Sequence, residues 1–248
     1  MKSITVVVPT YNSIKFIQSC MRSVLAQTYE HMDILVCDNE STDGTYEYLQ
    51  SIKNSKFELV SLPNIIPNGY REAIEYVFPD CQTDYVTFIA SDDIVAPIYI
   101  QQCMDVLNQE ENIIRCMQSA MVCIDVYNKP TGQVLSYFYH DLDEFKRMFM
   151  KRSPVTTPTV VFHRDLWELF EDGYEAHAKA GLVNLEAGDY DFWGKLANAG
   201  VFIKPISKCL GYCYKWHADQ ATWNIHKKSI NYDKIVQLYW GRKWGFIK

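Results

Sequence analysis

The sequence predicts an α/β fold with a mostly parallel central sheet flanked by helices on both faces. Short apolar, β-branched runs alternate with segments of helical periodicity through residues 1–96. Several of these runs end on polar or acidic residues, which is typical of the ligand-binding edge of such a sheet. Neither an internal repeat nor a low-complexity linker divides the chain. We therefore expect one domain over residues 1–248, with a regular half at 1–96 and a mixed second half at 97–248.

The first half alternates strands and helices at even spacing. Helical periodicity is expected over 13–27 and 69–78, and in a helix that contains Tyr46 and Leu49. The predicted strands cover residues 4–8, 33–37, 57–62 and 85–90.

The second half has a less regular pattern after Pro97. The runs 115–127 and 133–139 flank a five-residue loop at 128–132 and predict a hairpin. The other predicted elements are helices over 98–111, 141–151 and 189–199 and strands over 159–163, 201–203 and 209–215.

Composition excludes several classes of protein. The net charge of −6 argues against broad nucleic-acid binding. Eight cysteines are scattered without a CxxC motif, which suits reduced core residues of a cytosolic protein. The chain shows neither a signal peptide nor an apolar run of about 18 residues. We expect a cytoplasmic protein.

The stretch from Tyr85 to Pro97 carries the first functional signal. A buried strand that ends on two carboxylates, Asp92 and Asp93, needs positive charge nearby. Two hard oxygen ligands suit Mg²⁺ or Mn²⁺ carrying a phosphate ester. The alternative is a turn in which Asp93 caps the helix that starts near Pro97.

Four stretches of the chain carry motifs at residues 6–12, 23–28 with 34–45, 91–93, and 188–193 followed by 214–217. They resemble the motifs of family 2 glycosyltransferases, which use nucleotide-sugar donors. The resemblance implies a GT-A fold, in which a Rossmann-like half binds the nucleotide sugar and the second half binds the acceptor. The chain departs from the family pattern at three positions where another residue replaces an acid, Ala90, Asn39 and Gly188. A further family motif is reduced to Asn64 and Arg71.

The resemblance also implies a donor site. Asp38 would accept a hydrogen bond from N3–H of a uracil, and Tyr11 would stack on the ring. Alternatives are an Asx turn for Asp38, a helix cap for Asn12, and solvated side chains for Arg71 and Lys215. The expected donor-binding residues are Pro9, Thr10, Tyr11, Asn12, Asp38, Arg71, Ser91, Asp92 and Lys215.

The metal and the general base follow from the same resemblance. Asp93 and His217 are expected to bind Mn²⁺ or Mg²⁺, while Asp92 shares the metal or faces the ribose. Asp189 is the expected general base and Asp191 the alternative. An N-cap role is the structural alternative for Asp189. A carboxylate base with direct displacement implies inversion at the anomeric carbon.

The expected activity is transfer of a sugar from a UDP-sugar to a hydroxyl of a glycan or lipid-linked saccharide. A nucleotidyltransferase and a non-catalytic relative that binds glycans or scaffolds a partner are the alternatives. Residues 226–248 contain six Lys or Arg against Asp233 alone, interleaved with aromatic residues. This segment could contact a membrane surface. The alternative is a C-terminal helix packed on the core.

Overall fold

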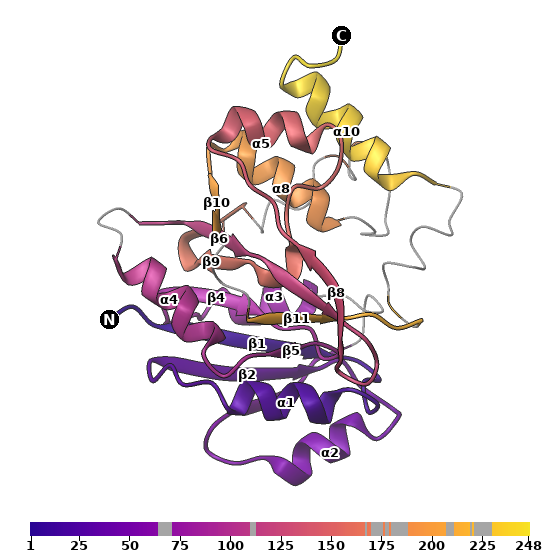
Figure 1. Cartoon of the computed structure of the whole chain (residues 1–248). Helices are drawn as coiled ribbons and strands as arrows, with labels where there is room; N and C mark the ends of the chain where they lie inside the picture. Colours follow the sequence, from indigo (N-terminus) through magenta and orange to yellow (C-terminus); the bar gives the residue numbers. More distant parts are fainter. Residues whose placement is uncertain are drawn as a thin grey trace.

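The computed structural model gives an α/β protein with a large sheet, a smaller sheet and a helical end (Figure 1). It describes residues 1–63, 71–109, 113–166, 168–169, 176, 179, 188–206, 211–218, 220 and 230–248, without the side chains of Arg71, Glu72 and Ile74. The strands are β1 Ile4–Thr10, β2 Met32–Asp38, β3 Glu58–Ser61, β4 Tyr85–Phe88, β5 Ile94–Val95, β6 Cys116–Ser119, β7 Met121–Ile124, β8 Pro130–Leu135, β9 Val161–His163, β10 Ile203–Ile206 and β11 Tyr212–Lys215. The helices are α1 Ile17–Leu25, α2 Thr45–Ile52, α3 Arg71–Val77, α4 Tyr99–Gln109, α5 Leu142–Phe149, α8 Gly188–Asn198 and α10 Tyr232–Lys243, with 3₁₀ turns η1 Thr157–Thr159 and η2 Arg164–Leu166.

The central sheet confirms the predicted α/β class. Its strand order is β10-β6-β9-β4-β1-β2-β3, and β1 pairs in parallel with both β2 and β4. Only β9 runs antiparallel to its neighbours, β4 and β6. The carboxyl ends of β1, β2 and β4 therefore meet at one edge, where ligands bind in open α/β sheets.

The two faces of the sheet carry separate hydrophobic clusters. In β1, Val6 and Val8 face a cluster with α1 and α4, whereas Val7 faces a cluster with α3, α5, α8 and α10. Both faces are covered, which explains why β1 reads as a continuous apolar run rather than an alternating one. The second cluster includes Trp240, close to the end of the chain.

The second sheet has the order β5-β11-β7-β8 and begins where the predicted strand 115–127 breaks. Ala120 separates β6 in the large sheet from β7 in the small one. At this point the hydroxyl of Thr159 accepts from Ser119 N at 3.0 Å, and the hydroxyl of Thr156 donates to Ser119 O at 2.6 Å. Backbone groups of Ser119 thus bond side-chain hydroxyls. The single strand predicted here is therefore divided between the two sheets.

Several predicted boundaries differ from the structure. The hairpin forms, but its turn begins after Asp125, whose Oδ1 accepts from Tyr127 N at 2.8 Å and Lys129 N at 2.9 Å. Strand β8 therefore begins at Pro130, inside the predicted loop 128–132. Helix α1 begins at Ile17 rather than at residue 13, strand β10 covers 203–206 rather than 201–203, and β5 was not predicted. Residues 207–210, at the start of the predicted strand 209–215, lie outside the described residues.

Candidate active site

Buried polar atoms without partners lie at the carboxyl ends of β1 and β2. Thr10 and Asp38 are register partners there, and Asn39 N donates to Thr10 O at 2.9 Å. Within the described part of the chain, Thr10 Oγ1, Asp38 Oδ1 and Asn39 Nδ2 are buried and have no hydrogen-bond partner. An unsatisfied buried polar group costs about 1–3 kcal/mol. Three of them on neighbouring residues indicate a place where a polar ligand binds.

The loops after β1 and β2 hold each other in place. Asn12, at φ 48°, accepts from Thr42 N at 2.8 Å through its side chain, and its own N–H donates to Ser41 Oγ at 2.9 Å. One oxygen of Asp38 has the local turn contact that was the alternative to base binding, because Oδ2 accepts from Ser41 N at 2.9 Å. Asn12 does not cap α1, whose N-cap is Phe16. Asp38 thus fixes its loop with one oxygen and leaves the other available.

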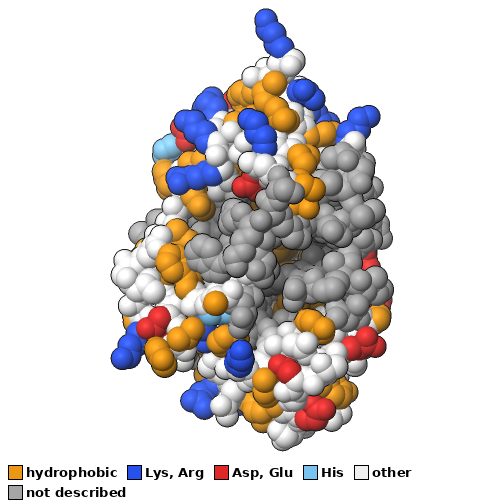
Figure 2. Space-filling view, turned by 90° about the vertical axis from the view of Figure 1, so that its right-hand side faces the viewer, with side chains coloured by type: hydrophobic (Ala, Val, Ile, Leu, Met, Phe, Trp, Pro, Cys, Tyr) orange, Lys and Arg blue, Asp and Glu red, His pale blue; other side chains and the backbone are white. Residues whose placement is uncertain are grey.

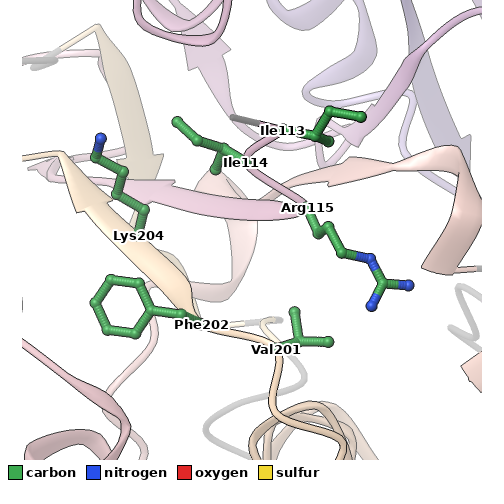
Figure 3. A pocket seen from close by; sticks show the side chains of 6 residues that line it. All are labelled: Ile113, Ile114, Arg115, Val201, Phe202 and Lys204. Carbon is green, nitrogen blue, oxygen red and sulfur yellow. The ribbon is translucent and has the colours of Figure 1, made fainter. Parts of the chain in front are cut away.

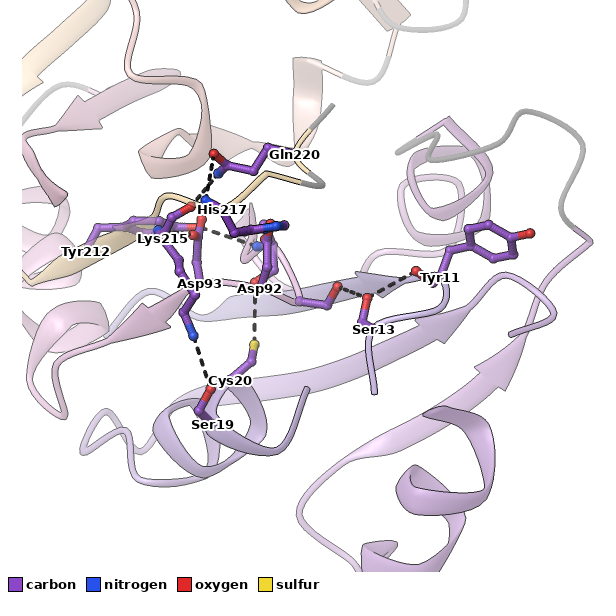
Figure 4. A network of polar contacts seen from close by, with 12 residues as sticks. Tyr11, Ser13, Ser19, Cys20, Asp92, Asp93, Tyr212, Lys215, His217 and Gln220 are labelled. Atoms are coloured by element: carbon purple, nitrogen blue, oxygen red, sulfur yellow. Dashed lines mark hydrogen bonds and ion pairs between the residues drawn. The ribbon is translucent and has the colours of Figure 1, made fainter. Parts of the chain in front are cut away.

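Ser91 links the turn after β1 to the turn after β4. Its hydroxyl lies 2.7 Å from the hydroxyl of Ser13, which donates to Tyr11 O at 3.1 Å. The half-buried ring of Tyr11 points away from this network (Figure 4). The backbone of Tyr11 is therefore fixed while its ring is directed outward, as stacking on a base requires.

Asp93 is buried completely and its carboxylate is bonded on both oxygens. Lys215 N donates to Oδ1 at 2.7 Å and Tyr212 Oη donates to Oδ2 at 2.8 Å. Burial, together with the nearby charge of Asp92, raises the pKa of Asp93 well above its usual value. The sequence pointed to Asp93 as the first metal ligand. In the structure, both oxygens of its carboxylate attach β11 to the turn after β4.

Asp92 and His217 form a pair on the outer side of the same turn. His217 Nε2 lies 2.8 Å from Asp92 Oδ2, and their side chains are 7% and 26% exposed (Figure 4). The imidazole packs on Phe16 at 4.4 Å between ring centroids, and within the described residues no partner is found for its buried Nδ1. Two residues 125 positions apart in sequence thus present an oxygen and a nitrogen side by side.

Lys215 lies beneath this pair rather than in solvent. It is 2% exposed, its Nζ lies 3.5 Å from Ser19 Oγ, and it sits over the ring of Phe16 at 5.2 Å. Burial lowers the pKa of Lys215, while Asp93 and Asp92 oppose that shift. The solvated alternative for Lys215 is therefore wrong. Its charge lies within the network and offsets the two carboxylates.

Asp189 lies in the first turn of α8 with an exposed side chain. Its Oδ2 accepts from the hydroxyl of Thr157 at 2.7 Å, and its Oδ1 accepts from Tyr190 N at 2.9 Å. The helix begins at Gly188, so Asp189 lies inside the helix rather than at the N-cap. An exposed, oriented carboxylate is what a general base needs.

Asp191 points to the opposite side of α8 and is fully buried. Its Oδ1 accepts from the indole Nε1 of Trp240 at 2.7 Å, which fixes α10 against α8. A Cβ on Gly194 would lie 2.4 Å from the same indole nitrogen, so the close approach of the two helices requires glycine. Asp191 therefore holds two helices together, whereas the side chain of Asp189 is exposed to solvent.

For two of the expected donor-binding residues, Pro9 and Arg71, the structure shows the position in the fold but no side-chain contact that bears on donor binding. Pro9 is buried within β1, opposite Cys37 in the register with β2. Arg71 is the first residue of α3, but its side chain, like Asn64 of the same motif, lies outside the described residues. Within the described ranges, no group of three or more His, Cys, Asp or Glu side chains is placed to hold a metal.

A small pocket of about 200 Å³ lies elsewhere, lined by Ile113, Ile114, Arg115, Val201, Phe202 and Lys204 (Figure 3). These residues come directly before or at the start of β6 and β10. Both β4 and β6 run antiparallel to β9, so the amino end of β6 is at the edge opposite the carboxyl end of β4. The pocket is separate from the site described above.

A family model for glycosyl transferase family 2 matches residues 5–170, well over half of the chain. The chain belongs to glycosyl transferase family 2. The match covers β1 to the 3₁₀ turn η2, and therefore includes Thr10, Asp38, Asp92 and Thr157. Asp189 and His217 lie beyond it.

Curated relatives of this transferase are glycosyltransferases too. The chain is 24% identical to hyaluronan synthase of Pasteurella multocida over 99% of its length and 26% of the relative's. It is 26% identical to chondroitin synthase of Escherichia coli over 94% of its length and 32% of the relative's. The chain thus spans about a quarter to a third of these relatives. It is 29% identical to the Escherichia coli UDP-Glc:alpha-D-GlcNAc-diphosphoundecaprenol beta-1,3-glucosyltransferase WfaP, over 96% of its length and 86% of WfaP.

Solved structures place the transferase in the GT-A fold. Staphylococcus aureus TarS 1–349 in complex with UDP-GlcNAc aligns with a TM-score of 0.61 at 18% identity, over 92% of this chain and 62% of TarS. The mannosyltransferase PcManGT from Pyrobaculum calidifontis, in complex with GDP-Man and Mn²⁺, aligns with a TM-score of 0.56 at 16% identity over 91% and 61% of the two chains. These identities support the fold alone.

The sequence did not point to several residues that build this site. Phe16 packs on His217, and Tyr212 bonds Asp93. Thr157, which contacts the carboxylate of Asp189, differs from them, because the family resemblance already implied that residues 153–158 lie near the acceptor. Asp43 accepts from Ile14 N at 3.1 Å and from Thr45 N at 3.0 Å. Burial opposes the shift, but these bonds lower the pKa of Asp43. The sequence signal for Asp43 was its position within the Ser-Thr-Asp-Gly-Thr stretch.

Proposed function

We propose that the transferase moves a sugar from a UDP-sugar to a hydroxyl of a glycan or lipid-linked saccharide, with inversion at the anomeric carbon. The observation that carries the proposal is the set of unpartnered buried atoms on Thr10, Asp38 and Asn39. Uracil presents an N–H donor flanked by two carbonyl acceptors. Asp38 Oδ1 would accept from that N–H, and Asn39 Nδ2 would donate to a carbonyl beside it.

Tyr11 and Asn12 support the same donor site. The ring of Tyr11 points out from a backbone fixed by Ser13, and could cover the face of the base. Asn12 joins the loops that border the nucleotide. Arg71 is the first residue of α3, and we propose it as a donor-binding cation from the family resemblance. Guanine also offers a carbonyl beside an N–H, but it carries an exocyclic amino group where uracil has its second carbonyl. That amino group would need a further acceptor, and Asp38 Oδ2 already accepts from Ser41 N at 2.9 Å.

The residues that would hold a divalent cation are Asp92 and His217. Their facing atoms are 2.8 Å apart, close to the spacing of about 3 Å between neighbouring ligands around an octahedral ion with bonds of about 2.1 Å. Among the described residues, no group bonds the Nδ1 of His217. No hydrogen bond there therefore fixes which ring nitrogen carries the proton, and Nε2 could bind the ion. A carboxylate with an imidazole suits Mn²⁺, and Mg²⁺ is the second choice. A bound cation would neutralise charge on the leaving diphosphate.

Asp93 and Lys215 would position this pair rather than bind the donor directly. Asp93 bonds the backbone of Lys215, which lies two residues before His217, so it sets where the imidazole is held. Lys215 contributes buried positive charge next to Asp92 and Asp93. Ser91 fixes the turn that carries Asp92. The donor-binding role expected for Ser91 and Lys215 is therefore indirect in this proposal.

Asp189 would remove the proton from the acceptor hydroxyl. As the acceptor oxygen forms its bond to the anomeric carbon, the bond from that carbon to the diphosphate breaks, and UDP leaves with the electron pair. The proton passes to the carboxylate of Asp189, and the hydroxyl of Thr157 keeps that carboxylate oriented. Attack from the face opposite the leaving group inverts the configuration.

A glycan or lipid-linked acceptor is proposed from the relatives. Hyaluronan and chondroitin synthases make polysaccharides, and WfaP acts on a sugar linked to diphosphoundecaprenol. The test is release of UDP from a panel of UDP-, GDP- and dTDP-sugars with Mn²⁺, with and without a chelator. Metal-dependent turnover of a UDP-sugar is expected. Absence of turnover with every donor, in a folded protein that still binds glycans, would favour the non-catalytic alternative.

A further inference from the structure

One end of the molecule concentrates positive charge in an acidic protein. We define the helical cap as residues 141–152, which contain α5, and residues 230–248, which contain α10. The cap carries eight Lys or Arg and four Asp or Glu, a net charge of +4, while the whole chain carries −6. The remaining residues therefore carry −10. The protein is strongly polarised along its long direction.

Within the helical cap, the cations gather where the carboxyl ends of α5 and α10 meet. Phe149 and Trp244 pack at 5.1 Å between ring centroids, and a Cβ on Gly241 would lie 2.5 Å from Met150. The exposed cations around this junction are Arg147, Lys151, Arg152, Arg242, Lys243 and Lys248. Figure 2 shows Lys and Arg side chains spread over this end, with hydrophobic side chains between them.

The four acids of the cap lie at the amino ends of its helices, three at α5 and Asp233 in the first turn of α10. Asp141 accepts from Glu144 N at 2.8 Å as the N-cap, and Glu144 Oε2 accepts from His140 N at 2.8 Å. Helix dipoles favour a cation or two in each last turn. Lys151, Arg152 and Lys248 lie beyond the last turns, so the dipoles do not account for them.

Exposed apolar groups accompany the cations. Phe246, just beyond the carboxyl end of α10, is 47% exposed, and Ile230, before the amino end of the same helix, is 43% exposed. The helix itself is packed on the core through Tyr232, Val236 and Trp240. The packed-helix alternative is therefore confirmed for α10, and its outer surface carries the charge. A surface with several cations and scattered apolar groups matches an anionic bilayer, with phosphates outside and hydrocarbon beneath.

We propose that the helical cap docks this protein on an anionic membrane surface. Within the described ranges, no helix has the length and apolar character that crossing a bilayer requires, and the proposed contact is at the surface. The cap is also bonded to the acceptor side of the site. Tyr190, next to Asp189, donates its hydroxyl to Phe149 O and accepts from Gln237 at 3.1 Å. Docking would thus hold the acceptor edge at a fixed orientation to the bilayer.

Vesicle binding does not rest on the proposed transferase activity, so it is measured without donor or acceptor. The full chain is floated with vesicles of phosphatidylcholine alone, or mixed with phosphatidylglycerol, at low and physiological salt. We expect binding to the mixed vesicles only, and weaker binding at the higher salt because exposed charges are screened. Absence of binding to mixed vesicles at low salt, or equal binding to neutral vesicles, would overturn the proposal.

A charge-matched pair of variants locates the contact. In the cap variant, Arg147, Lys151, Arg242 and Lys248 are each replaced by Gln. In the control variant, Arg22, Lys53, Lys56 and Lys129, exposed cations outside the cap, are each replaced by Gln. Each cation near an anionic surface strengthens binding by about fivefold, so the loss of four cations in the cap variant should lower partitioning by roughly 600-fold.

The control variant has the same net charge as the cap variant. We expect it to bind the mixed vesicles as the natural sequence does. Melting temperatures of both variants confirm that they are folded. Equal losses in the two variants would show that net charge rather than the cap governs binding, and would overturn the proposal. Binding of the cap to a soluble polyanion but not to mixed vesicles would overturn it as well.

Discussion

At the scale of single residues, neighbouring carboxylates take different roles because their surroundings differ. Asp92 faces His217 at the surface, while Asp93, the next residue, is buried with both oxygens bonded. Asp189 is exposed beside Thr157, while Asp191 is buried against Trp240. In each pair one acid is available to a ligand and the other holds two elements together. The predictions at this scale separate the members of each pair.

The first prediction concerns Asp189 and Asp191. Asp189→Asn should keep donor affinity and the fold but lower turnover by about 10²–10⁴-fold, because the amide cannot take the proton. Asp191→Asn should lower the melting temperature while turnover changes little, because it weakens the bond that fixes Trp240. Turnover at saturating donor and acceptor, beside donor binding and melting curves, checks both. If Asp191→Asn is inactive and Asp189→Asn is not, the base is misassigned.

The second prediction concerns Asp92 and Asp93. Asp92→Asn should abolish the stabilisation that Mn²⁺ adds to UDP binding, with little effect on the unliganded protein. Asp93→Asn should leave that metal response in place. It should lower stability by about 1–3 kcal/mol, because an amide cannot accept from both Lys215 N and Tyr212 Oη. Thermal melting with UDP, with and without Mn²⁺, distinguishes the two. If Asp93→Asn instead loses the response to Mn²⁺ and Asp92→Asn keeps it, Asp93 is the metal ligand.

At the scale of elements, helix α8 connects the catalytic edge to the end of the molecule. Its first turn carries Asp189, its buried face binds Trp240 of α10, and Tyr190 bonds the last carbonyl of α5. This arrangement depends on Gly194, where α10 approaches so closely that a Cβ would overlap the indole. The position of Asp189, the proposed general base, is thus coupled to the packing of the C-terminal helix.

The third prediction tests this coupling. Gly194→Ala should force Trp240 away from α8 and destabilise the protein by about 1–3 kcal/mol, the usual cost of overpacking a core. The melting temperature should fall, and turnover should fall with it because Asp189 shifts. Asn198→Ala, on the exposed face of the same helix, is the control and should leave both unchanged. Normal stability in Gly194→Ala would mean that the two helices have room between them.

At the scale of the whole molecule, the two halves contribute different parts of one site. Residues before β5 supply the edge of the sheet with Thr10, Asp38 and Asp92, and later residues supply His217 and Asp189. β11 joins them, because its residues Tyr212 and Lys215 bond Asp93 across the turn. A donor that contacts both halves should therefore stabilise the whole chain.

The fourth prediction is a thermal shift. UDP with Mn²⁺ at 100 times its dissociation constant should stabilise the native state by about 2.7 kcal/mol, or roughly 5–10 °C for a chain of this size. GDP should shift the melting temperature less, because Asp38 and Asn39 match the edge of uracil. A chelator should reduce the shift obtained with UDP. A larger shift with GDP than with UDP would contradict the assignment of the base.

The sequence alone determined the α/β class, the order of the first elements and the family, because buried strands and amphipathic helices leave periodic patterns and the motifs are local. It also pointed to Asp93 and His217, with Asp92 as a further candidate, for the metal and to Asp189 for the general base, and these roles stay predictions. It could not decide which of two adjacent acids is buried, where one apolar run divides between β6 and β7, or that Thr157 meets Asp189. Those outcomes depend on contacts between residues tens of positions apart. Only the packing of β11, α8 and α10 decides which side chains face solvent and which face each other.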